Sequence, residues 1–269
     1  MKICAFLPVY NEENRIGYAL NSLQWCDEII VLDKGSVDAT RTICADYGNA
    51  IVHTIINSVD LKIETNIFLD SCKSDWIIIF TASDIMHPRL AQEIRKVIEI
   101  TDASVLSIPF KRMVMGIGSV RSPWDTDYNP IIFKRADIVI NHNVVHGVIQ
   151  SNGKTEKIVN CDEFPMYHLT HDTVEKLIER HVRYWEGEAK AKQINLCKSI
   201  VDVIRALFNI IFIRKTYLLG YDGIALIFSY LSYLMMSYVY KWNALSDRTL
   251  IYKEIRERIN RNWSEYNAK

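Results

Sequence analysis

The sequence predicts an α/β fold in which a mostly parallel sheet is flanked by helices and is followed by a C-terminal helical extension. Over residues 1–109, apolar runs of strand length alternate with segments of helical periodicity. From residue 173 onward, helical patterns follow one another without strands between them. Strands separated by helices imply right-handed crossovers and parallel neighbours, so ligands are expected at the carboxyl ends of the strands.

The alternating part defines the expected elements in chain order. Pro88 suits the first turn of a helix, where its missing N–H is not needed. The expected strands are Ile3–Val9, 28–32, Ala50–Thr54, 76–80 and 105–109, and the expected helices are 14–24, 39–47, 61–72 and Pro88–Ile100.

Residues 110–165 break the alternation. The stretch 111–130 is rich in Gly, Pro, Trp and Asp, which is typical of loops. Short strands are expected at 131–133, Ile138–Ile140 and 144–149, with turns at 141–143 and 151–153. We therefore expect one domain over 1–165, in which 1–109 binds the first substrate and 110–165 forms a looped, partly antiparallel region for a second substrate.

Composition excludes some classes of protein. Lys+Arg and Asp+Glu both number 32, so no net charge indicates a nucleic-acid partner. The six cysteines show no metal-finger spacing and are expected to be reduced, mostly buried thiols of a cytosolic protein. The N-terminal apolar run stops at Pro8, which is too short for a signal peptide and fits a buried strand.

Three polar loops follow strands that we expect to be neighbours, at residues 10–14, 33–38 and 81–87. The first turn offers backbone amides, Asn11 and Glu12 to a ligand. The second carries Asp33 at a strand end, where it can accept hydrogen bonds from a ribose or a base. The alternative is that Asp33 and Asp38 only cap the turn between strand and helix.

Taken together and in this order, the motifs resemble family 2 glycosyltransferases with the A-type fold. The nearest branch is the one that contains lipopolysaccharide-core β-glucosyltransferases of Gram-negative bacteria. The resemblance covers almost the whole chain and rests on the three loops, on His87-Pro88, and on further matches at residues 25–33, Asn66, 74–76, Trp124, Asp127, Val145-His146 and 168–170.

The resemblance implies a nucleotide-sugar donor, of which a UDP-hexose is expected, and a saccharide or lipid-linked glycan as acceptor. The reaction would be a single displacement with inversion at the anomeric carbon. It needs a base for the acceptor hydroxyl and positive charge for the departing diphosphate. The residues implied in donor binding are Pro8, Tyr10, Glu12 and Asp33 at the nucleoside, Lys62 and Asn66 at the base or diphosphate, and Ser83 and Asp84.

The third loop departs from the family pattern. Family members carry an Asp-x-Asp that binds Mg²⁺ or Mn²⁺, whereas this chain has Thr81-Ala82-Ser83-Asp84. The oxygens of Thr81, Ser83 and Asp84 could still form a weaker cation site. Alternatively, a histidine supplies a ligand and favours Mn²⁺, or catalysis needs no metal, or the protein is inactive. We expect a divalent cation on Asp84; the candidate histidines are His87, His146 and His168, of which the resemblance favours His168.

The general base is also not where the family pattern puts it. The resembled branch has a Val-His-Glu segment, but Gly147 follows Val145-His146 here. Asp127 is the best remaining carboxylate and Asp125 is the next. Both could instead make hydrogen bonds within a turn.

The C-terminal region, 166–269, is expected to be helical at 173–194, 199–213, 221–242 and 247–263. Residues 223–240 carry no charge and reach the lower length limit of a membrane span. Tyr and Ser recur along this segment, which fits an in-plane amphipathic helix pair better than a span. The alternative is burial of these helices against each other or in a homo-oligomer.

The sequence therefore predicts an inverting glycosyltransferase at the cytoplasmic face of the plasma membrane. One rival is a catalytically weak or inactive relative that still binds nucleotide sugars. A second rival is a nucleotidyltransferase, which is disfavoured because the first strand lacks a Gly-rich phosphate loop bearing Arg or Lys.

Overall fold

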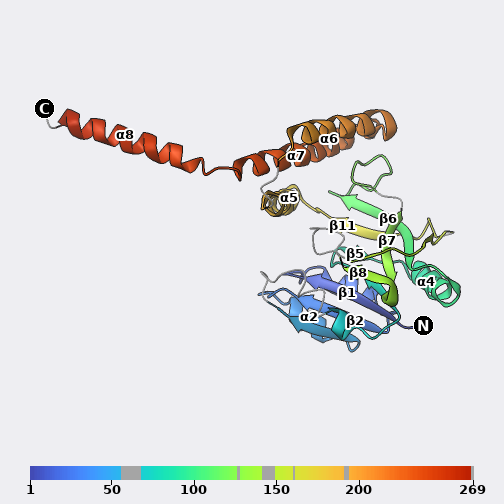
Figure 1. Cartoon of the computed structure of the whole chain (residues 1–269). Helices are drawn as coiled ribbons and strands as arrows, with labels where there is room; N and C mark the ends of the chain where they lie inside the picture. Colours follow the sequence, from blue (N-terminus) through green and yellow to red (C-terminus); the bar gives the residue numbers. More distant parts are fainter. Residues whose placement is uncertain (56–67, 126–127, 141–148, 160, 191–193, 268–269) are drawn as a thin grey trace. The chain divides into compact units, whose positions relative to one another are not determined.

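The computed structural model describes residues 1–55, 68–125, 128–140, 149–159, 161–190 and 194–267. The chain divides into two compact units, Met1–Val174 and Glu175–Lys269, and each is described by itself. Figure 1 labels the helices and strands.

The first unit is built on a nine-stranded mixed sheet in the order β3-β2-β1-β4-β7-β6-β11-β5, with β10 also paired to β6. Strand β1 pairs in parallel with β2 and β4, as does β2 with β3. The strands of this sheet are β1 (Ile3–Val9), β2 (Glu28–Asp33), β3 (Ala50–Thr54), β4 (Trp76–Ile79), β5 (Asp84–Ile85), β6 (Val105–Val114), β7 (Tyr128–Lys134), β10 (Thr155–Lys157) and β11 (Met166–Thr170).

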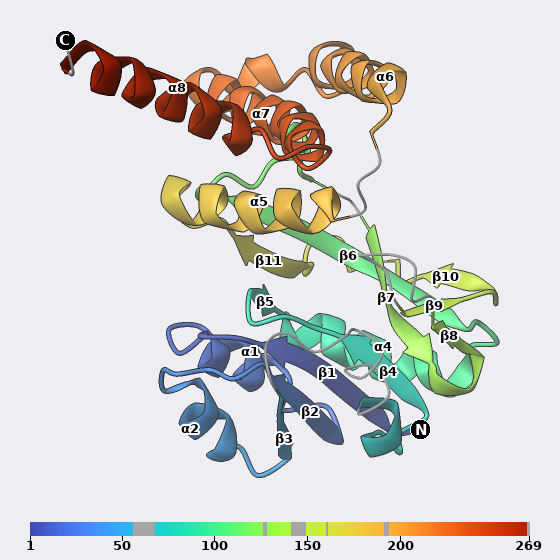
Figure 2. The same cartoon turned by 60° about the vertical axis from the view of Figure 1, so that its left-hand side comes forward.

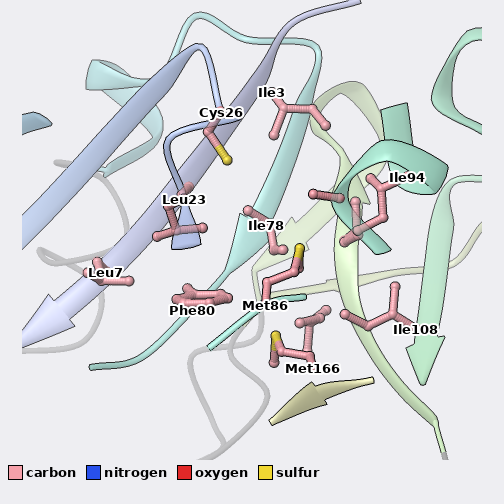
Figure 3. Close-up of a cluster of buried hydrophobic side chains, with 14 of the residues drawn as sticks. Ile3, Leu7, Leu23, Cys26, Ile78, Phe80, Met86, Ile94, Ile108 and Met166 are labelled. Atoms are coloured by element: carbon pink, nitrogen blue, oxygen red, sulfur yellow. The ribbon is translucent and has the colours of Figure 1, made fainter. Parts of the chain in front are cut away.

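Side chains of β1 alternate between two apolar layers, because successive residues of a strand point to opposite faces. Ile3 and Leu7 belong to the larger cluster, which also holds residues of α1 (Ile16–Ser22), α2 (Thr40–Ala45) and α4 (Pro88–Ile100). Figure 3 shows Leu7, Phe80, Met86 and Met166 from this cluster. Phe6 faces the other layer and stacks on Phe68 with ring centroids 4.0 Å apart. Apolar burial on both faces explains why these strands are almost continuously hydrophobic.

The second half of the sheet differs from the expectation in two places. Strand β6 continues to Val114 and β7 begins at Tyr128, so both ends of the expected loop 111–130 are strand. Residues 166–170, expected to lead into a helix, form β11. The physical reason is pairing over a long sequence separation, since Met166–Thr170 lies in parallel register with residues 110–114 of β6. Figure 2 shows β11 beside β6.

Strand β8 (Ile138–Ile140) was expected and pairs with β9 (Ile149–Ser151) in a separate two-stranded sheet. Most of the strand expected at 144–149 lies outside the described residues. A short 3₁₀ turn, Arg135–Asp137, precedes β8. All six cysteines are free thiols, and five of them are buried, as expected for reduced packing residues.

The second unit is helical. Its helices are α5 (Val174–Ala189), α6 (Leu196–Phe208), α7 (Tyr221–Asn243) and α8 (Thr249–Asn267), with a π turn at Asn209–Ile213 and a 3₁₀ turn at Thr216–Leu219. The helix expected over 199–213 therefore ends its α-helical part at Phe208.

Helices α5 and α7 are joined by polar contacts. The Trp185 indole donates to the Tyr233 carbonyl at 2.9 Å. The Glu188 carboxylate accepts hydrogen bonds from the Tyr233 hydroxyl at 2.9 Å and the Ser237 hydroxyl at 2.5 Å, and pairs with Lys241 at 2.7 Å. We call Glu188, Tyr233, Ser237 and Lys241 the α5–α7 polar cluster. It explains part of the polar stripe that the sequence shows along α7.

Candidate functional site

The loops after β1 and β2 are tied together at one rim of the sheet. Side-chain oxygens of each loop accept from backbone amides of the other: Asn11 N–H donates to Ser36 Oγ at 2.9 Å, and Val37 N–H donates to Asn11 Oδ1 at 2.9 Å. Asp38 accepts from the Glu13 amide at 3.1 Å. Asn11 adopts a positive φ of 53°, which Asn tolerates better than most residues. We call residues 10–15 and 33–40 the nucleoside half of the rim.

The predicted nucleoside residues take different positions in this half. Pro8 is half-buried within β1, and Tyr10 is 38% exposed at its end, where its ring can stack on a base. Glu12 forms a two-pronged salt bridge with Arg15. Asp33 is fully buried, and its carboxylate accepts from the Ser36 amide at 3.1 Å and lies 3.7 Å from Arg41 Nε. Asp33 therefore closes the turn, and a contact with the nucleoside stays a prediction.

Asp84 is held by the third loop and by β11. Its Oδ2 accepts from the Thr81 amide at 2.7 Å and from the Thr81 hydroxyl at 2.9 Å. Its Oδ1 lies 2.6 Å from His168 Nδ1. The Leu169 amide donates to the Ser83 carbonyl at 2.8 Å, which fixes the loop to β11. Asp84 and Ser83 are both buried.

Strand register extends this contact into a row of three ionisable side chains. His168 is directly opposite Asp84 of β5 and opposite Arg112 of β6. Residues opposite each other on neighbouring strands share a face of the sheet. Phe110, two residues before Arg112, stacks against the His168 ring with centroids 5.6 Å apart. We call Asp84, His168 and Arg112 the cross-strand row.

A cavity of about 440 Å³ lies beside the row, with Phe110 in its wall. Asp125, 5% exposed, also lines it. Arg112 donates from Nη1 to the Trp124 carbonyl at 3.1 Å and so holds the backbone next to Asp125. The remaining lining residues are Pro109, Lys111, Gly118, Val120, Tyr128, Asp162 and Pro165.

Tyr128 and Asp162, which both line the cavity, are bonded to each other. The Tyr128 hydroxyl donates to Asp162 Oδ1 at 2.6 Å, and Lys157 lies 4.8 Å from the centre of the Tyr128 ring. An aromatic ring beside carboxylate and ammonium groups offers both an apolar face and hydrogen-bond partners, which a saccharide needs.

Arg15 brings positive charge to the same rim. Helix α1, which Arg15 precedes, packs against β5. Partial burial alone would lower the pKa of Arg15, but hydrogen bonding to Glu12 and the negative charges of Glu12, Asp172 and Asp84 raise it. Arg15 therefore stays charged at this rim, with its guanidinium paired to Glu12.

Other predicted residues are outside the site or outside the described residues. His87 caps α4, since its Nδ1 accepts from the Arg89 amide at 3.1 Å. His168, expected at a helix start, lies instead on β11. Lys62, Asn66, Asp127 and His146 lie outside the described part of the chain.

Within the cross-strand row, Asp84 and His168 carry atom types that ligate divalent cations, whereas Arg112 is itself a cation. An ionised carboxylate has about four acceptor positions, and three on Asp84 are used by Thr81 and His168. His168 bonds Asp84 through Nδ1, which directs its second ring nitrogen elsewhere, as in many metal-binding histidines held by a carboxylate. Among the described residues, the one cluster of three His, Cys, Asp or Glu side chains with suitable spacing is Cys4, Glu28 and Cys72, away from this rim. A cation at the row would therefore take the rest of its ligands from phosphate and water.

Comparisons with known proteins identify the family. Residues 4–159 match the profile of glycosyl transferase family 2. The chain is 24% identical over 280 residues to an uncharacterized glycosyltransferase of Rickettsia conorii, with 96% of each chain covered. It is 27% identical over 259 residues to one of Rickettsia typhi, covering 88% of this chain and 86% of that one. Its fold is similar to that of residues 1–349 of TarS of S. aureus, crystallised with UDP-GlcNAc, at 15% identity and a TM-score of 0.50 over 91% of this chain and 84% of that chain.

Proposed function

Because the chain belongs to glycosyl transferase family 2 and is a glycosyltransferase with the A-type fold, we propose that it transfers a hexose from a UDP-sugar, with inversion, to a saccharide or lipid-linked glycan. The motifs favour the lipopolysaccharide-core branch. The UDP moiety is supported by TarS, which was crystallised with UDP-GlcNAc, and by the nucleoside half of the rim.

The observation that carries the proposal is that the cross-strand row adjoins the cavity. Phe110 touches both, since it stacks on His168 and lines the cavity. The donor's diphosphate would lie at the row and the acceptor sugar in the cavity. The anomeric carbon would then lie between them, within reach of the loop that carries Asp125.

The chain's own carboxylates would move the proton. Asp125, or Asp127 two residues later, accepts the proton of the acceptor hydroxyl as its oxygen bonds to the anomeric carbon. The bond to the diphosphate oxygen breaks at the same time, and the diphosphate leaves with the electron pair. Attack from the face opposite the leaving group inverts the configuration.

Positive charge at the leaving group would come from two sources. His168 would ligate a Mn²⁺ or Mg²⁺ ion through its second ring nitrogen while Asp84 holds the ring, and imidazole ligation favours Mn²⁺. Such a cation neutralises charge on the departing diphosphate. Arg15 supplies a protein cation near Asp84. With Thr81 and Ser83 in place of acidic residues, the site would bind the cation more weakly than an Asp-x-Asp site. The same loss motivates the second candidate, a weak or inactive relative that binds the donor.

The test is turnover of a panel of UDP-hexoses, including UDP-glucose, UDP-galactose and UDP-GlcNAc, with Mn²⁺ or with EDTA. We expect EDTA and Asp84→Ala each to lower turnover by roughly 10²-fold or more, since each removes stabilisation of the leaving group. Asp102→Ala, which removes an exposed carboxylate paired with Lys154, is the matched control and should keep full activity.

Each outcome decides one part of the proposal. Turnover that resists both EDTA and Asp84→Ala would show that the cation site is wrong. UDP binding without turnover of any donor would favour the inactive relative. The anomeric configuration of the product, read by NMR, tests inversion.

A further inference from the structure

Helix α7 exposes most of its apolar surface. Among the described residues it is the one helix whose length and composition would let it cross a membrane, yet 11% of its most apolar 18-residue window is buried. Soluble proteins rarely leave a continuous apolar helix face uncovered. Unit 2 therefore has an exposed apolar surface, which we expect a binding partner to cover.

The two faces of α7 have opposite character. Tyr233, Ser237 and Lys241, four residues apart, face α5 through the polar cluster. At 100° per residue, the opposite face carries mainly apolar side chains, interrupted by Ser232. The apolar ones include Ile224, Phe228, Met235, Val239 and Trp242, and these five are exposed, with Phe228 at 68%.

The α5–α7 polar cluster argues against α7 as a membrane span. It occupies the C-terminal half of α7, so a spanning α7 would take Glu188 and the charged helix α5 into the hydrocarbon core. Ionised side chains at that depth cost several kcal/mol each. A helix that is polar along one side and apolar along the other is stable at the interface plane instead.

Helix α6 presents a second exposed apolar stripe. Ile200, Ile204 and Phe208 recur every four residues, and the Phe208 ring packs at a tilt against Phe212 of the π turn with centroids 5.1 Å apart. All four side chains are at least half exposed. The stripe continues the apolar surface beyond α7.

Helices α6 and α7 form a hairpin with a close crossing. They lie side by side in Figures 1 and 2. A Cβ on Gly223 would collide with the carbonyl oxygen of Thr216, so only glycine permits the 3₁₀ turn to approach α7 this closely. The hairpin therefore holds the two apolar surfaces on one structural element.

The charge of the hairpin indicates what binds to its apolar surface. Between residues 196 and 220, Lys198, Arg205, Arg214 and Lys215 stand against a single acidic residue, Asp202. Basic side chains beside an apolar face are attracted to anionic lipid headgroups.

We propose that the α6–α7 hairpin binds in the plane of an anionic phospholipid bilayer, with α5 on its aqueous side. The apolar stripes enter the boundary between headgroups and acyl chains, and the cations contact the headgroups. This binding is independent of catalysis, so it can be tested whether or not a donor is turned over.

The test is flotation of the full chain with vesicles of phosphatidylglycerol and phosphatidylethanolamine, or of phosphatidylcholine alone. We expect binding to the anionic vesicles, and at least tenfold lower partitioning for Ile204→Glu/Phe228→Glu, because each Glu replaces an exposed apolar side chain that would enter the bilayer. Lys215→Glu should weaken binding about fivefold or more on anionic vesicles and little on phosphatidylcholine. Ile100→Glu, an exposed apolar residue of the first unit, is the matched control and should bind as the unaltered chain does.

Circular dichroism confirms that each variant is folded before binding is compared. Equal flotation of the double variant and the control would overturn the proposal. So would a detergent-free dimer in sedimentation that does not bind vesicles, since a second copy would then cover the hairpin. Resistance to extraction by alkaline carbonate would indicate a span and would overturn the in-plane arrangement.

Discussion

The nucleoside half of the rim and the cross-strand row are built differently. In the nucleoside half, side chains such as Asn11 and Asp38 bond to backbone amides of two short loops, and the partners lie within 30 residues of each other. In the row, Asp84 and His168 bond side chain to side chain across 84 residues of sequence. One region is a shaped backbone surface, and the other is an assembly of distant charged groups.

The difference indicates how each region tolerates change. A backbone surface depends on local turns, so a substitution there should cost stability and leave the chemistry intact. On the proposed function, the row and the neighbouring Asp125 would act through individual charges, so substitutions there should cost turnover more than stability. The following variants test this contrast.

The largest expected effect is on the base. If Asp125 is the proposed general base, Asp125→Asn removes the proton acceptor but keeps the shape of the cavity wall, so kcat should fall by about 10³-fold, with UDP affinity unchanged. Steady-state transfer and UDP titration measure the two quantities. The control is Asp162→Asn, the other carboxylate of the cavity, which should raise the KM of the acceptor more than it lowers kcat. Full activity of Asp125→Asn together with loss in Asp127→Asn would assign the base to Asp127.

A smaller effect is expected at Arg112, which positions the Asp125 loop through the Trp124 carbonyl. Loss of a hydrogen bond from a charged donor is worth about 1.5–3 kcal/mol, so Arg112→Gln should lower kcat by at least about tenfold. Arg112→Lys should recover part of that loss. If Arg112 served only the fold, neither Arg112→Gln nor Arg112→Lys would change kcat selectively. An equal loss of UDP affinity would mean that Arg112 contacts the donor directly.

The smallest effect is expected on stability in the nucleoside half. Burial alone would raise the pKa of Asp38, but hydrogen bonds from the hydroxyl and amide of Thr40 and from the Glu13 amide hold it below its usual value. Asp38→Asn should therefore lower the free energy of unfolding by about 1 kcal/mol at pH 7, with kcat unchanged.

The difference in unfolding free energy between the unaltered chain and Asp38→Asn depends on pH, because folding lowers the pKa of Asp38. A lowered pKa means that the ionised carboxylate stabilises the fold above the usual aspartate pKa, and that this contribution is lost as the pH falls through the lower folded value. Urea unfolding should show a constant gap between the two proteins from pH 8 to about pH 5, which narrows below about pH 4. A difference in unfolding free energy that is as large at pH 3 as at pH 7 would contradict a stabilising role of the ionised Asp38 carboxylate.

Local sequence patterns predicted the first half of the sheet closely. Ile3–Val9, Ala50–Thr54 and Pro88–Ile100 have the bounds expected from apolar periodicity and from Pro88. Strand β1 is almost wholly buried and α4 buries a regular apolar stripe, so their patterns are strong, whereas β3 is a partly exposed edge strand that follows a turn. Strand β11 was missed because its five residues alternate weakly and their partner lies in β6, more than 50 residues earlier.

The candidate site also contains residues that sequence motifs predicted and residues that only the fold brings together. The sequence indicated Asp84 and His168 as ligands of one cation site, through motif resemblance, but not that their side chains bond to each other directly. Arg112 and Arg15 carried no motif, because only strand register and the packing of α1 on β5 bring them to the rim. Asp33 shows the opposite case: the sequence motif is clear, but it does not reveal that the carboxylate closes a turn.

The late position of β11 sets a lower limit on the size of an active fragment. The match to the family profile ends at residue 159, whereas β11 runs from Met166 to Thr170. A polypeptide cut at the profile boundary would lose His168, leave one edge of β6 without its partner, and expose Asp84 to solvent. Any attempt to transplant or miniaturise this enzyme therefore has to keep the chain to at least Thr170, eleven residues beyond the profile boundary at residue 159.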